Sequence, residues 1–122
     1  MVALYITIDT EYEFGFTAKH GASSRAENFR RSIQCTTPDG DVGIFHQMDV
    51  FDRHGLKAVF FVDPMPALLW GKGAIADVVE PIIERGHDVQ LHLHTEWLEL
   101  LGAANPLGGR TGANIKDFTC EE

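Results

Sequence analysis

The chain lacks several features that mark whole classes of protein. Among its 122 residues there are only two cysteines, and 10 lysines and arginines stand against 18 aspartates and glutamates, for a formal net charge of -8. Cys35 and Cys120 are far apart and show no ligand-type spacing, so we expect two free thiols. The basic residues form no cluster beyond Arg30 and Arg31, which argues against a nucleic-acid partner.

Long hydrophobic runs are also missing. No apolar segment has the length of a membrane span, and the opening residues MVALYITI contain neither the basic region nor the long apolar stretch of a secretory signal. We therefore expect a cytoplasmic protein without a membrane partner. There are no repeats or low-complexity segments, and 44% of the residues are hydrophobic, which predicts one globular domain over residues 1–122.

Apolar runs and helical periodicity alternate along the chain. Three short runs rich in β-branched residues predict strands, the first of them covered on both faces. Between them, apolar residues recur at helical spacing. This order implies an α/β fold with parallel strands and right-handed crossovers. The strands are expected at 3–8, 57–62 and 87–94, and the helices at 41–54 and 66–86.

Several local signals refine these elements. Asp41 fits the N-cap of the first helix, and Gly55 fits the position after its C-cap. The second helical stretch is expected to kink or split at Gly71 to Gly73 and again near Pro81. Residues 14–40 are rich in Gly, Ser and Thr and show no sustained period apart from a short turn of helix around residues 26–33, which predicts a long loop, and long loops in compact domains are often functional.

Acidic and imidazole side chains follow the first and third predicted strands. Asp9 and Glu11 end the first, and His92 and His94 end the third. Parallel strands end at the same rim and side chains alternate with a period of two, so these groups should converge there. Imidazole nitrogens with carboxylate oxygens suit Zn²⁺ with one position open for water. The pattern predicts a zinc centre in which one acid is a ligand and the other a general base.

Alternative interpretations remain open for several of these residues. Glu96 lies four residues after His92 and would replace His94 as a ligand if the chain turns helical there. Asp9 has a structural alternative as a cap of the following turn, and Glu13 is better explained as a solvated loop acid. Trp97 is either a core residue or the wall of a carbohydrate cleft.

Three segments together resemble a known family. YITIDTE, HGLKAVFFVD and IIERGHDVQLHLHTEW are similar, in order and spacing, to the first half of the polysaccharide deacetylase family (the NodB-homology domain), with residues 14–40 as an insertion. The resemblance implies the N-terminal portion of a deformed (β/α) barrel with three βα units. It also implies that Asp9 is the catalytic base and that Glu11 and His92 bind a divalent metal. The family's second histidine position falls on Glu96, so either His94 or Glu96 is the third ligand.

The family's later motifs supply an arginine that orients the base, groove aromatics and a histidine general acid, and none has a counterpart before residue 122. We therefore expect about half of a barrel, whose open sheet edge favours self-association. The implied activity is metal-dependent hydrolysis of C–N amide bonds, chiefly deacetylation of N-acetylated sugars or polysaccharide, with little turnover by this chain alone. The alternatives are a non-catalytic metal- or carbohydrate-binding remnant and a hydrolase of a small amide such as a ureide.

Overall fold

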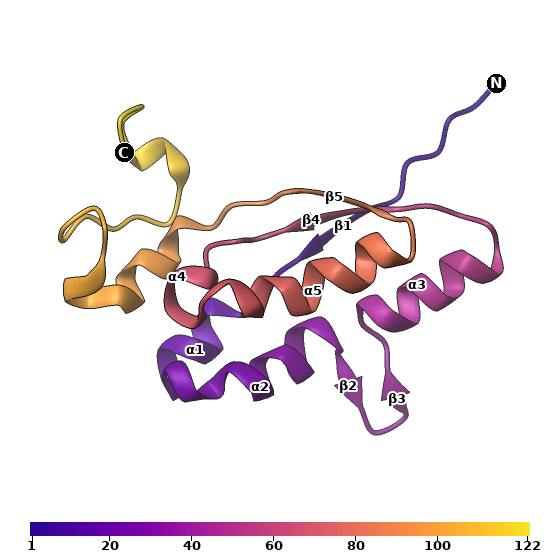
Figure 1. Ribbon diagram of the computed structural model, residues 1–122, viewed down its shortest axis with the longest axis horizontal. Helices are drawn as coiled ribbons and strands as arrows, with labels where there is room; N and C mark the ends of the chain where they lie inside the picture. The colour runs from indigo at the N-terminus through magenta and orange to yellow at the C-terminus, as the bar shows by residue number, and fades with distance from the viewer.

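The fold contains a three-stranded parallel sheet, and the α-helices lie to one side of its strands (Figure 1). The computed structural model describes residues 1–122. The strands are β1 (Thr7–Thr10), β4 (Val59–Val62) and β5 (Asp88–Leu91), in the spatial order β1-β4-β5. The predicted α/β class with parallel strands is confirmed. The sheet is open, with β1 and β5 as its edges, and it does not close into a barrel.

Helices and short turns make up most of the remaining chain. β1 and β4 are joined by a long segment that contains four short helical elements, a two-stranded hairpin and a longer helix, whereas β4 and β5 are joined by a split helix. None of the helices has both the length and the apolar character needed to cross a bilayer. The bounds are α1 (Phe14–His20), η1 (Ala22–Ser24), α2 (Arg25–Asn28), η2 (Phe29–Ile33), β2 (Thr36–Thr37), β3 (Gly40–Asp41), α3 (Ile44–Arg53), α4 (Ala67–Trp70), α5 (Lys72–Glu84), η3 (Thr95–Ala104) and η4 (Ile115–Asp117).

Glycine signals located two helix boundaries correctly. Gly55 follows the C-cap of α3 with φ of 64°, and Leu56 N–H returns to the carbonyl of Phe51 at 2.9 Å. Gly71, with φ of 79°, separates α4 from α5. The predicted break near Pro81 is wrong, because α5 runs through it to Glu84. A proline removes one helical hydrogen bond, and the burial of the α5 face against the core holds the helix together across that gap.

The start of α3 differs from the prediction. Asp41 is not the N-cap: it lies in β3, where its carboxylate accepts a hydrogen bond from the Thr36 hydroxyl at 2.7 Å. Gly43 precedes the helix, and its N–H donates to the carbonyl of Gln34 at 2.8 Å. A Cβ at Gly43 would stand 2.0 Å from the carbonyl oxygen of Ile33. The close backbone approach therefore fixes glycine at this position.

Two other expectations are corrected. Residues 14–40 are not a long loop, because α1, η1, α2 and η2 occupy most of them; the helical turn expected around residues 26–33 lies within α2 and η2. The first strand begins at Thr7 and not at residue 3, and residues 1–5 are exposed. β4 offers Thr7 a partner at Val59, and pairing starts there. The expectation of two free thiols is confirmed at Cys35 and Cys120.

The hydrophobic core lies between the helices and one face of the sheet. Ile8, Phe60 and Val89 are in register across the three strands and point to this covered face, where Phe60 is fully buried. Asp9, Phe61 and Gln90 form the next row, so their side chains point to the opposite, open face. The core residues are Tyr12, Ile33, Ile44, Met48, Ala58, Phe60, Val62, Ala74, Val78, Ile82 and Trp97.

Candidate metal centre

The carboxyl ends of the three strands bring three polar residues into one row. Thr10, Val62 and Leu91 are the last paired residues. Hydrogen bonds from Asp63 N–H to the carbonyl of Thr10 (3.3 Å) and from His92 N–H to the carbonyl of Val62 (3.1 Å) extend the pairing by one residue. The next row is therefore Glu11, Asp63 and His92. By alternation these side chains belong to the open face of the sheet.

Glu11, His92 and His94 form a compact cluster at this rim. The Oε2 atom of Glu11 lies 2.7 Å from Nε2 of His94 and 3.5 Å from Nε2 of His92, and the two Nε2 atoms are 2.8 Å apart. The side chains are 41%, 33% and 27% exposed in the order Glu11, His94, His92. Solvent therefore reaches a cluster whose ligand-type atoms already lie together.

These three residues could hold a metal ion. Their ligand atoms all lie within 4.8 Å of one another. Ligands of a tetrahedral zinc ion lie about 3.3 Å apart, given bonds of about 2.0 to 2.1 Å. The observed separations bracket that value. Two imidazoles and one carboxylate also leave a fourth position for water, which is the donor set of a catalytic zinc site. Both rings would then present Nε2 lone pairs, with the proton on Nδ1.

The other residues predicted for the site lie outside this cluster. Asp9 is exposed in β1, and by alternation it shares a face with Glu11, which directly follows the strand. Glu96 is partly buried in η3 and is not part of the group, whose third member is His94. Trp97 is 1% exposed and packs edge-on against Trp70 and Phe14, with ring centroids 5.4 and 5.9 Å away. It is a core residue and cannot wall a carbohydrate cleft.

Asp63 is a residue of this rim that the sequence interpretation missed. It is 1% exposed, and its Oδ1 atom accepts hydrogen bonds from the N–H groups of Met65 (3.0 Å) and His94 (3.4 Å). Burial raises its pKa, although those N–H groups favour the charged form. Its Oδ2 atom is buried without a partner. The signal was present, because Asp63 directly follows the apolar run at 57–62 just as Asp9 follows the apolar run at 3–8.

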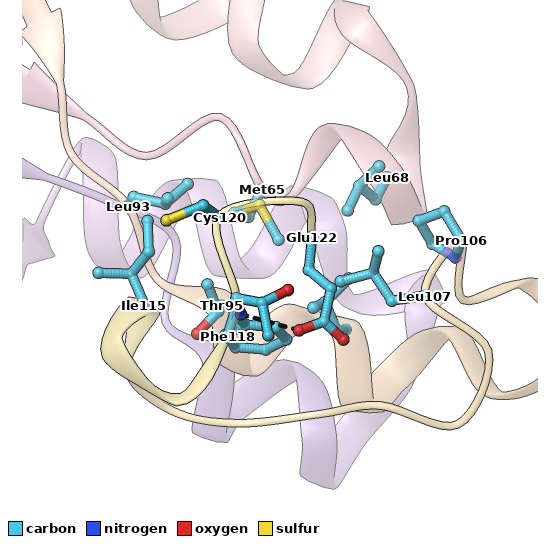
Figure 2. A pocket seen from close by; sticks show the side chains of 12 residues that line it. Met65, Leu68, Leu93, Thr95, Pro106, Leu107, Ile115, Phe118, Cys120 and Glu122 are labelled. Atoms are coloured by element: carbon cyan, nitrogen blue, oxygen red, sulfur yellow. Dashed lines mark hydrogen bonds between the residues drawn. The ribbon is translucent and has the colours of Figure 1, made fainter.

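A mostly apolar cavity lies beside the histidine segment but does not contain the cluster. It has a volume of about 530 Å³, and it opens between the strand ends and the C-terminal segment (Figure 2). Leu93 and Thr95 line it, whereas His92 and His94 do not. Along residues 92–95, the side chains therefore alternate between the metal-binding cluster and the lining of the cavity. A ligand in the cavity would face Met65 and Phe118 and not the metal-binding atoms.

Comparison with protein-family models, curated proteins and solved structures finds no match for this chain. The similarity of its three strand segments to polysaccharide deacetylases therefore stays a prediction.

Proposed function

We propose that the chain carries the metal centre of a metal-dependent hydrolase of C–N amide bonds, acting on N-acetylated sugars or polysaccharide. The observation that carries the proposal is the convergence of Glu11, His92 and His94 from the two outer strands, with ligand-type atoms 2.7 to 3.5 Å apart. The family resemblance of the same residues gives the substrate class and the deformed (β/α) barrel of which this sheet would be the first part. Zinc is the ion that two imidazoles and one carboxylate suit best.

In this proposal the chain's residues divide the work between binding and proton transfer. Glu11, His92 and His94 hold the ion. A zinc ion bound there would acidify water and polarise the amide carbonyl. Asp9 is exposed and shares the face of Glu11, about 7 Å away along the strand. Its carboxylate takes a proton from the attacking water as general base. Hydrolysis would release acetate and leave a free amine on the sugar.

Metal analysis tests the binding half of the proposal. We expect purified protein to hold about one zinc per chain. His92→Ala should lose at least about 100-fold in affinity, because removing a ligand costs more than the roughly 10- to 100-fold lost when a residue that orients a ligand is removed. Gln90→Ala is the matched control, because Gln90 lies two residues earlier on the same strand and face. It should bind zinc like the wild type. Equal, sub-stoichiometric zinc in wild type and His92→Ala would refute the centre.

An acetate-release assay on a full-length version of the protein, which includes the later motifs, tests the catalytic half. With acetylated amino-sugar oligomers, Asp9→Asn should lower turnover about 100-fold or more while zinc content stays unchanged. Asp88→Asn, a second exposed acid of the sheet, should have no effect. Unchanged turnover in Asp9→Asn would remove it from the base role. One zinc per chain with no release of acetate from sugars or ammonia from ureides would instead support a non-catalytic binding module.

A further inference from the structure

A buried asparagine holds the backbone next to the metal ligand Glu11. Asn28, in α2, is fully buried, and its side chain makes four hydrogen bonds. Its Oδ1 atom accepts from Glu13 N–H and from the Ser32 hydroxyl, both at 2.9 Å. Its Nδ2 group donates to the carbonyl of Glu13 and to the Thr17 hydroxyl, both at 2.8 Å. An amide side chain can hardly be satisfied more completely.

The two bonds to Glu13 resemble those of a neighbouring β-strand, because they pair both backbone polar groups of one residue. Asn28 holds both the N–H and the carbonyl of that residue, so the backbone there is fixed in position and direction. On the other side of Glu11, the carbonyl of Thr10 is bound by Asp63 N–H. Between them, Tyr12 is buried and its hydroxyl donates to the carbonyl of Ala74 at 2.9 Å. The backbone that carries Glu11 is therefore held at Thr10, Tyr12 and Glu13.

Burying an amide is costly unless all its hydrogen bonds are made. Asn28 makes them, but an apolar residue in a core position would avoid the cost altogether. Unlike apolar contacts, the hydrogen bonds of asparagine are directional, so each of them fixes the position of its partner group. Three of its four bonds, those to Glu13 and Thr17, lie on the segment that immediately follows Glu11. No bond of Asn28 reaches a metal-ligand atom, so any effect on the centre passes through this backbone.

We propose that Asn28 is a positioning residue for the metal ligand Glu11. It preorganises the turn after β1 so that the carboxylate meets His92 and His94 before an ion binds. The inference rests on the proposed metal centre and adds to it a residue from an element that carries no ligand. Residues that orient metal ligands typically contribute 10- to 100-fold in affinity.

The first test compares zinc affinity in three proteins, measured by competition with a chelator at a temperature where all are folded by circular dichroism. Asn28→Ala should bind zinc at least about tenfold more weakly than wild type. Val78→Ala is the control for lost stability, because Val78 is a buried core residue of α5 with no role at the rim. It should bind within about threefold of wild type, since a folded centre is unaffected by a distant cavity. Equal affinity in Asn28→Ala and Val78→Ala would overturn the inference.

A double-mutant cycle separates positioning from general loosening of the site. If Asn28 acts through Glu11, Asn28→Ala should cost less than about twofold in a Glu11→Gln background, because the carboxylate it positions is gone. In a His94→Ala background it should keep its tenfold effect, because Glu11 is still a ligand. Asn28 is neutral, so its removal does not alter the charge near the ion. Equal losses in the two backgrounds would contradict the inference.

Thr17→Val is the alternative variant for the zinc-affinity measurement if Asn28→Ala does not fold. Thr17 is buried, and its hydroxyl accepts from Asn28 and donates to the carbonyl of Glu13 at 3.3 Å. Valine keeps the shape and removes both bonds, so affinity should fall about threefold or more, and only while Glu11 is present. Thr17→Val with wild-type affinity would also overturn the inference. Wild-type protein without zinc affinity would refute the metal centre itself, which is a different result from tight binding unaffected by Asn28.

Discussion

The two faces of the sheet differ in what their side chains do. On the covered face, Ile8, Phe60 and Val89 pack against helices and contribute to the core. On the open face, Asp9 lies in one row with Phe61 and Gln90. At the rim lie Glu11, His92 and His94, which could hold a metal ion. Successive residues of one strand thus belong to different environments.

This difference separates stability from chemistry along each strand. Burial of a large apolar side chain contributes about 1.5 to 3 kcal/mol, and this contribution is made almost entirely on the covered face. The carboxylate of Glu11 and the imidazoles of His92 and His94 gain little from burial, since they stay partly exposed. Substitutions one residue apart should therefore have different consequences, and the following predictions test that separation.

The largest effect is expected from the neighbouring pair Phe60 and Phe61. Phe60→Ala should lower the free energy of unfolding by about 3 to 5 kcal/mol, because it empties a fully buried position. Phe61→Ala should cost less than half as much, because its ring is only partly buried on the open face. Urea denaturation of both variants measures the difference. Equal losses would show that the open face is covered as completely as the other.

The next effect concerns two acids of the same segment. Glu11→Gln should weaken zinc binding about 10- to 100-fold with little change in the stability of the metal-free protein, because a neutral amide is a poor zinc ligand. Glu13→Gln should leave zinc affinity unchanged, because the Glu13 carboxylate is exposed and its ion pair is a long one, 3.9 Å from Arg31. Isothermal titration with zinc compares the two. A similar loss in both would point to general electrostatic attraction instead of ligation.

A smaller effect is expected on the covered side as pH falls. Burial lowers the pKa of His87, which packs against Phe60 and accepts a hydrogen bond from Ala58 N–H. The unfolded chain therefore takes up this proton more readily than the folded protein, and the free energy of unfolding should decrease as pH drops below about 6.5. Denaturation of metal-free protein at several pH values measures the slope. His87→Asn should flatten it, whereas His20→Asn, an exposed histidine, should not.

The smallest effect is expected from the ion pair between Arg25 and Asp77, which joins α2 to α5 at 2.5 Å. Both side chains are well exposed, at 35% and 58%, so solvent screens the pair. Asp77→Asn should lower the free energy of unfolding by no more than about 1 kcal/mol and leave zinc affinity unchanged. Thermal denaturation and zinc titration check both expectations. A fall in affinity would mean that α2 is positioned through its surface as well as through Asn28.

The sequence was sufficient to predict three parallel strands and the convergence of Glu11, His92 and His94, because both depend on local pattern. Short apolar runs mark β4 and β5, and the spacing of His92 from His94 puts both on one side of an extended chain. The start of β1 was misjudged, because its limit is set by where β4 begins to pair with it.

The residues that hold the site were harder to predict. Asn28 reads as an ordinary polar residue in a Ser- and Gly-rich stretch, and its value comes from contacts with Glu13 and Thr17, which are distant in sequence. The small helices around it have no sustained apolar period, so residues 14–40 resembled a loop. Asp63 follows its strand in the manner of Asp9, but nothing in the sequence says that the carboxylate is buried.

The order of the strands has one more consequence. Glu11 follows one outer strand and His92 follows the other, so an ion shared by them would bridge the central strand and close a loop containing both crossover connections. Such a bridge restricts the unfolded chain as a covalent cross-link does. In a protein whose two cysteines are unpaired, a metal bound there would act as a removable cross-link across the sheet, and a chelator would lower the free energy of unfolding of the metal-bound protein.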